Sequence, residues 1–151
     1  MGLKHNLRPL LELESGSNDP MAYIMTTTFI YLIQEPNTSF ATIGWMLVRS
    51  IALGSIAGWA FGKASLWVIN RIKLDTDGLY PVLMMATTLL TFAATDLTGG
   101  NGFLAIYISA IILGNSNFVH KRSLMQFNDG LAWLMQVVMF LMLGLLVYPS
   151  E

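Results

Sequence analysis

The sequence predicts an all-α fold, a polytopic transmembrane helical bundle with about five spans. It carries 8 Lys or Arg and 9 Asp or Glu, and these charged residues are 11% of its 151 residues, whereas soluble domains carry about 25%. Five apolar stretches follow one another, and none alternates with a period of two as barrel strands do. Together with the net charge of -1, these features exclude a soluble enzyme, a disordered chain and a nucleic-acid binder.

The expected spans are separated by short stretches rich in turn residues and helix breakers. The fourth span is the weakest, because an apolar core of about 12 residues rises only about 18 Å as a helix, against about 30 Å of hydrocarbon. It needs its polar flank out to Phe118, or burial inside the protein. The five spans are predicted at residues 9–33, 43–69, 80–97, 102–118 and 130–147.

Lys and Arg mark alternate connections between the spans. They precede the first span, recur in the second and fourth connections, and are missing from the first and third connections and from the tail after Val147. By the positive-inside rule, this pattern predicts a cytoplasmic N-terminus and an outer C-terminus. Lys63, near the inner end of the second span, can extend its amino group to the interface.

Three acids, Glu12, Glu14 and Asp19, fall inside the first span. Each charge at the membrane centre costs about 2.5–3.5 kcal/mol on insertion scales, so such residues need a partner, a cation or a water cavity. The alternative is that the acids lie at the interface and that Asp19 is only the N-cap of a helix beginning at Pro20.

Helical spacing groups the polar residues of this span. Glu14 and Asn18 are four residues apart, as are Ser15 and Asp19, so the four lie on adjoining rows of one face. Carboxylate, amide and hydroxyl oxygens are the hard ligands that a small monovalent cation needs, and Asp19 can also bind a proton. A site that holds a proton or a cation, but never both, is the core of an exchanger.

Pro20 and Gly16 add a backbone feature to this site. Pro20 cannot donate a hydrogen bond to the carbonyl of Gly16, and its ring pushes against that carbonyl. We therefore expect a kinked helix with a free carbonyl beside Asn18 and Asp19.

The third and fourth spans meet in a glycine-rich connection that contains Asp96, Gly100 and Asn101. This composition is compatible with an interrupted helix pair whose ends point at a substrate. The alternative is an ordinary outer loop, which the absence of Lys and Arg fits. For Asp96, a position facing a cavity and a position in such a loop are both open.

Small residues recur every four positions along the second span, at Ser50, Gly54, Gly58 and Gly62. Such a stripe lets another helix approach closely, either within the fold or across a homodimer seam. Gln136 is the strongly polar side chain of the fifth span, suited to a helix-to-helix hydrogen bond or to lining a pathway.

The sequence indicates neither an enzyme nor a resident cofactor. There is no Cys, and no nucleophile elbow, phosphate-binding loop or zinc motif is present. His5 and His120 have no second ligand at metal spacing, so no metal is expected beyond a transported monovalent cation.

The string from Glu14 through Ser15, Asn18 and Asp19 to Pro20 resembles the ESxxND signature of the monovalent cation/proton antiporters. Within their sodium/proton exchanger-like branch it is most similar to the bacterial NhaP-type potassium/proton antiporters. The likeness continues through 39–72, 100–105, 113–115 and 127–144, which is nearly the whole chain.

The resemblance implies that Asp19 carries the ion and the proton, that Asn18 supports it and marks the electroneutral branch, and that Glu14 and Ser15 belong to the same site. It implies potassium or sodium exchange for protons by alternating access in the bacterial inner membrane. A homodimer of the full-length protein is also expected.

The family fold has inverted repeats around a midplane site, which need more spans than this chain holds. In the family the Glu matching Glu14 pairs with an Arg on a later helix, and a second discontinuous helix crosses the carrier helix. Neither feature has a counterpart here. We therefore expect an internal piece of a longer transporter; a non-transporting accessory subunit and a channel fragment are the alternatives.

Overall fold

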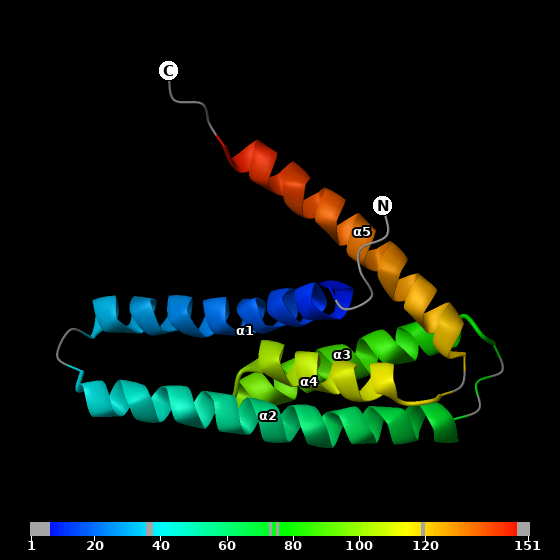
Figure 1. Cartoon of the computed structure of the whole chain (residues 1–151), viewed down its shortest axis with the longest axis horizontal. Helices are drawn as coiled ribbons and strands as arrows, with labels where there is room; N and C mark the ends of the chain where they lie inside the picture. Colours follow the sequence, from blue (N-terminus) through cyan, green and yellow to red (C-terminus); the bar gives the residue numbers. More distant parts are fainter. Residues whose placement is uncertain (1–6, 36–37, 73, 75, 119, 148–151) are drawn as a thin grey trace.

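The computed structural model describes residues 7–35, 38–72, 74, 76–118 and 120–147, with the backbone only at 7–13, 15 and 17. Within these residues all regular structure is helical, which confirms the all-α prediction (Figure 1). The five helices are α1 (Leu7–Gln34), α2 (Phe40–Arg71), α3 (Leu79–Leu97), α4 (Gly102–Asn115) and α5 (Lys121–Leu146).

Three of the described helices, α2, α3 and α5, are long and apolar enough to cross a membrane, and α4 is a shorter apolar helix. Helix α1 is not among them, although it has 28 residues. It is the helix that carries Glu12, Glu14 and Asp19, so its charges lower its hydropathy. Length and hydropathy alone therefore fail to mark the helix that holds the motif.

Two helix boundaries differ from the predicted spans. Helix α4 ends at Asn115 rather than near Phe118, because Ser116 turns to an extended conformation and its N–H donates to the carbonyl of Leu113. Helix α4 instead lies between its neighbours, with Ala105, Ser109 and Leu113 buried. Helix α5 begins at Lys121, nine residues before the predicted start at 130. The apolar pattern shows which part of a helix is hydrophobic, whereas backbone hydrogen bonds determine where the helix begins and ends.

Helix α2 is the central helix of the bundle, and α3 and α4 form an antiparallel hairpin that packs along it (Figure 1). The contact between α2 and α4 is the most extensive of all, and α1 touches the hairpin mainly through α4. Helix α5 packs against α3 near its own start and then diverges from the other helices (Figure 1). The tip of the α3–α4 hairpin consequently ends partway along α2.

An apolar cluster holds one end of the bundle together. It consists of Ile69 of α2, Tyr80 of α3, Leu113 of α4 and Leu124 of α5, all buried. The hydroxyl of Tyr80 also donates to the carbonyl of Ile72, 3.3 Å away. The ends of four helices are thus fixed at the α2–α3 and α4–α5 connections.

Basic residues gather at this same end. Arg71 lies in the last turn of α2, and Lys121 and Arg122 begin α5. The ammonium of Lys121 donates to the carbonyls of Gly114 and Ser116, at 2.6 and 3.0 Å, and so caps the end of α4. Lys4 and Lys73, which also enter the predicted charge pattern, lie outside the described residues.

Large apolar side chains cover the outside of the bundle. All four Trp residues are at least 60% exposed, namely Trp45, Trp59, Trp67 and Trp133. Along α5 almost every large apolar side chain after Leu124 is exposed. Such a surface is suited to lipid or to further protein, because water would not solvate it.

Candidate functional site

Asn101, at the tip of the α3–α4 hairpin, joins three helices. Only 1% of its surface is exposed. Its side-chain amide nitrogen donates to the carbonyl of Pro20 in α1 at 3.2 Å, and its Oδ1 accepts from the N–H of Leu104 at 3.1 Å, which caps α4. Its own backbone N–H donates to the carbonyl of Ser50 in α2 at 3.0 Å. Buried hydrogen bonds therefore link the hairpin tip to both α1 and α2.

Glycines make this close approach feasible. A Cβ on Gly54 of α2 would lie 2.8 Å from the carbonyl oxygen of Asn101, and one on Gly100 would lie 3.1 Å from the backbone nitrogen of Gly54. Gly99 has φ +78°, a left-handed conformation that favours glycine, and it reverses the chain between α3 and α4. These positions need glycine for contact and for turning.

The hairpin tip does not lie at the end of α2. Ser50 follows the start of α2 at Phe40 by ten residues, which is about 15 Å along the helix axis. Because α2 has 32 residues and is about 48 Å long, it exceeds the roughly 30 Å of hydrocarbon, so this position is compatible with both interpretations of the segment that contains Gly100 and Asn101.

Pro20 is buried and lies well inside α1, which is helical on both sides of it. The alternative in which Asp19 caps a helix that begins at Pro20 is therefore wrong. The carbonyl that receives a side-chain donor is that of Pro20 itself. Four residues earlier, Gly16 leaves room for the ring of Tyr107 from α4, which a Cβ at that position would overlap.

The predicted ion ligands lie on the open side of α1. Glu14, Asn18 and Asp19 are exposed, and the side chain of Ser15 lies outside the described part. Helices α2 to α5 thus leave the carboxylates of Glu14 and Asp19 uncovered. Among the described residues there is no group of three acids or histidines that would hold a metal ion.

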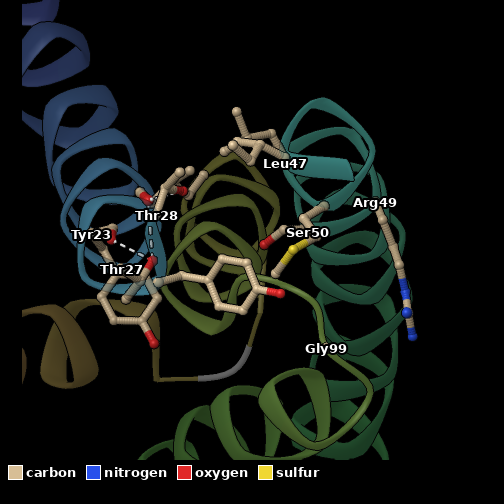
Figure 2. Close-up of a pocket in the computed structure, with 11 residues that line it drawn as sticks. Tyr23, Thr27, Thr28, Leu47, Arg49, Ser50 and Gly99 are labelled. Carbon is tan, nitrogen blue, oxygen red and sulfur yellow. Dashed lines mark hydrogen bonds between the residues drawn. The ribbon is translucent and has the colours of Figure 1, made fainter. Parts of the chain in front are cut away.

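A cavity of about 350 Å³ lies between α1 and α2 beyond the hairpin tip (Figure 2). Thr27 and Thr28 of α1 face Ser50 of α2 across it (Figure 2). The hydroxyl of Thr27 donates to the carbonyl of Tyr23 at 2.9 Å. The full lining is Tyr23, Ile24, Thr27, Thr28, Tyr31, Ile43, Met46, Leu47, Arg49, Ser50 and Gly99.

The hydroxyl groups of this cavity were not predicted from the sequence. Tyr23, Thr27 and Tyr31 continue from Asp19 at intervals of four residues along α1. This spacing places them on the same row of the helix surface as Asp19, and all three line the cavity, whereas Asp19 does not. The four-residue spacing of these hydroxyl residues is visible in the sequence. Only the structure shows that the spacing brings them to one cavity.

Arg49 binds the end of α3. Its Nη2 donates to the carbonyl of Thr98 at 3.4 Å, next to Gly99. A cation at a helix C-terminus complements the exposed carbonyls and the helix dipole. Arg49, which also lines the cavity, thus links α2 to the hairpin tip.

The small-residue stripe of α2 packs against α4. A Cβ on Gly58 would lie 2.6 Å from the carbonyl oxygen of Ala105, and one on Gly62 would lie 3.0 Å from the Cα of Ser109. Together with Gly54 and Ser50, these residues bring the two helix backbones into contact. The stripe is therefore occupied within this chain.

Two predicted site residues are not brought to this region. Asp96 is exposed near the end of α3, and Gln136 is exposed on α5, which leaves the bundle. The residues that do converge are Pro20 of α1, Ser50 and Gly54 of α2, and Gly100 and Asn101 of the tip. The convergence thus joins backbone groups and one amide, while the charged groups remain on the outer face of α1.

The whole chain, residues 1–151, matches the family model described as the transmembrane sodium/hydrogen exchanger. It is 34% identical over 149 residues to the K(+)/H(+) antiporter NhaP of Alkalimonas amylolytica, covering 99% of this chain and 26% of that protein. It is 36% identical over 151 residues to the K(+)/H(+) antiporter NhaP2 of Shewanella baltica, with the same two coverages of 99% and 26%.

A more distant relative is the Na(+)/H(+) antiporter NhaG of Bacillus atrophaeus, 27% identical over 158 residues, with 96% of this chain and 29% of that protein covered. No solved structure matches the chain. The chain spans about a quarter of the length of these relatives, 26–29%. With its family match over residues 1–151 and its apolar helices, the chain is an integral membrane protein that belongs to the transmembrane sodium/hydrogen exchanger family.

Proposed function

We propose that the complete protein containing this chain is an electroneutral antiporter that exchanges protons for potassium or sodium ions. The observation that carries the proposal is the Glu14–Pro20 motif on a helix that the bundle holds at Pro20. The names of the relatives, two potassium/proton antiporters and one sodium/proton antiporter, support the exchange and leave both cations open.

In this proposal Asp19 binds either a proton or a dehydrated cation. The oxygens of Asn18, Ser15 and Glu14 complete the coordination of the cation, because they lie on adjoining rows of α1. A single carboxylate that exchanges one proton for one monovalent cation moves no net charge. The side chains of Glu14, Asn18 and Asp19 are exposed in the described chain, so further helices of the complete protein would enclose them.

Alternating access requires the carrier helix to move against a stable support. Helix α1 touches α4 through the Asn101 bond, the Tyr107 ring over Gly16, and the ring pair of Tyr23 and Phe103 with centroids 4.9 Å apart. These are few contacts, whereas α2 and α4 are in extensive backbone contact. We therefore assign movement to α1 and support to α2–α4, with the cavity between α1 and α2 as one route toward Asp19.

The proposal also places the protein in the bacterial inner membrane, with the N-terminal end of α1 toward the cytoplasm. The positive-inside rule gives this orientation, since Arg71, Lys121 and Arg122 lie at one end of the bundle. The complete protein is proposed to be a homodimer. Its dimer contact uses a face other than the glycine stripe, because α4 covers that stripe.

The test is cation-coupled proton flux in proteoliposomes that contain the complete protein. After a pH jump, the wild type should move protons in exchange for potassium or sodium, and Asp19→Asn should fall to the level of protein-free vesicles. Asp77→Asn is the matched control, because Asp77 is an exposed acid in the α2–α3 connection, and it should keep wild-type flux.

Exchange retained by Asp19→Asn would refute the assignment. Cation flux that is independent of the proton gradient would indicate a channel instead. The 151-residue chain by itself should show no flux, since its ion ligands are uncovered, and robust flux by this chain would contradict that expectation.

A further inference from the structure

A basic groove lies at the C-terminal end of α2, apart from the candidate ion site. Its volume is about 380 Å³, and it is lined by Lys63, Leu66, Trp67, Asn70 and Arg71. Lys63, Trp67 and Arg71 are four residues apart and therefore form one row along the helix surface. The lining contains two cationic side chains and no acid, so it is suited to an anion.

The groove combines charge with the amphipathic features of a membrane interface. The indole of Trp67 is 63% exposed, and the guanidinium carbon of Arg71 lies 6.0 Å from its ring centroid. Lys63 precedes Arg71 by eight residues, which is about 12 Å along the axis toward the apolar part of α2. Its long side chain can extend back toward Arg71 and bring both cations to one level.

The same row continues as an apolar surface. Trp59 lies four residues before Lys63, is 60% exposed, and has Ile56 as an exposed neighbour on the preceding turn. A free phosphate would use only the charged end of this surface. A molecule with an anionic head and long apolar chains would use both parts.

We propose that this groove binds the headgroup of an anionic phospholipid such as phosphatidylglycerol. The phosphate lies between Lys63 and Arg71, Trp67 lies beside the glycerol backbone, and an acyl chain follows α2 past Trp59. The end of α2 that carries the groove also carries the α2–α3 and α4–α5 connections, so the site lies in the leaflet on the basic side of the bundle (Figure 1).

The experiment measures lipid retention by the complete protein, using native mass spectrometry with phosphatidylglycerol and phosphatidylcholine titrated separately. The variant Lys63→Gln/Arg71→Gln should retain phosphatidylglycerol about 25-fold more weakly, because each basic group near a membrane surface contributes about fivefold. Arg122→Gln removes a basic residue at the same end but outside the groove, and it should bind like the wild type.

A second variant, Trp67→Leu, keeps both charges and removes the ring, so it should lose only a few-fold in retention. Equal thermal unfolding of all variants in detergent checks that they fold. Wild-type retention by the double variant, equal retention of phosphatidylcholine, or displacement of the lipid by inorganic phosphate alone would each overturn the proposal. Asp19→Asn should bind the lipid normally, so failure of the antiport proposal and failure of this one are distinguishable.

Discussion

The two interfaces of α4 differ in kind. Against α2, glycines at 54, 58 and 62 bring backbone onto backbone, with Gly58 facing the carbonyl of Ala105. Against α1, the contacts are made by side chains, chiefly Tyr107 over Gly16 and the amide of Asn101 on the carbonyl of Pro20. The first interface has little freedom to slide, whereas the second can be altered by rotating a few side chains.

This contrast follows from the physics of membrane helices. Lipid chains are as apolar as leucine, so helices associate through close packing and hydrogen bonds rather than through the hydrophobic effect. The glycine stripe therefore fixes α2 to α4, and α1 depends on single polar and aromatic contacts. The helix that bears Glu14 and Asp19 is the less firmly held of the two. Substitutions at each interface can therefore distinguish the proposed supporting helices, α2–α4, from the proposed moving helix, α1.

The largest effect is expected at the α2–α4 interface. Gly58→Ala places a Cβ 2.6 Å from the backbone oxygen of Ala105, where no flexible side chain can yield, so the free energy of unfolding should fall by about 3 kcal/mol. Gly44→Ala is the control, because nothing lies within 4 Å of its Cβ, and it should be neutral or slightly stabilising. Thermal unfolding in detergent measures both, and equal stability of the two variants would contradict the packing model.

The next effect is expected at Asn101, where capping of α4 and attachment of α1 can be separated. Asn101→Asp keeps an acceptor for the N–H of Leu104 but loses the donor to the carbonyl of Pro20, and should cost about 2 kcal/mol. Asn101→Ser also keeps a cap but adds no charge, so it should cost less. Hydrogen exchange should show the extra loss of protection in α1 rather than in α4. Loss confined to α4 would mean that the Pro20 bond is unimportant.

A smaller effect is expected at the contact between Gly16 and Tyr107. Gly16→Ala overlaps the Tyr107 ring, but that ring is a half-buried side chain that can turn aside, so the cost should be about 1 kcal/mol. Tyr107→Leu removes the overlapping atoms, and the double variant should recover most of the loss. A double-mutant cycle on unfolding measures this coupling, and strictly additive effects would refute the contact.

The smallest effect is expected at Arg49. Its bond to the carbonyl of Thr98 is long at 3.4 Å and exposed, so Arg49→Gln should change the unfolding free energy by no more than about 0.5 kcal/mol. A loss of unfolding free energy as large as that of Gly58→Ala would contradict this expectation and show that Arg49 is essential to the packing of α2 with α3 and α4. Thermal unfolding of the two variants in parallel gives the comparison.

Much of the fold was predictable from local pattern. Apolar runs and breakers placed five helices in the described chain close to the predicted spans, because burial in lipid rewards continuous hydropathy. Helix α5 begins at Lys121, before the apolar stretch predicted as the fifth span, because a helix can extend beyond its apolar part. The end of α4 at Asn115 was set by a local turn that hydropathy does not register.

The candidate site was predictable in part. The cost of charge in a membrane singled out Glu14 and Asp19, and the glycine connection singled out Gly100 and Asn101. That Asn101 bonds to Pro20, 81 residues away in the sequence, could not be predicted, because nothing local relates two such distant groups. The sequence shows Tyr23, Thr27 and Tyr31 only as residues spaced four apart. That they line a cavity is known only from the structure.

The sequence by itself determined that this is a membrane-embedded helical protein with a carboxylate motif on its first helix. These features follow from composition and spacing, which act within one helix at a time. Only the tertiary structure decided that the glycine stripe faces α4, that the α3–α4 tip ends partway along α2, and that Asn101 fastens this tip to α1. Such pairings depend on which helix surfaces fit together in space, and the sequence of a single helix does not identify the helix that packs against it.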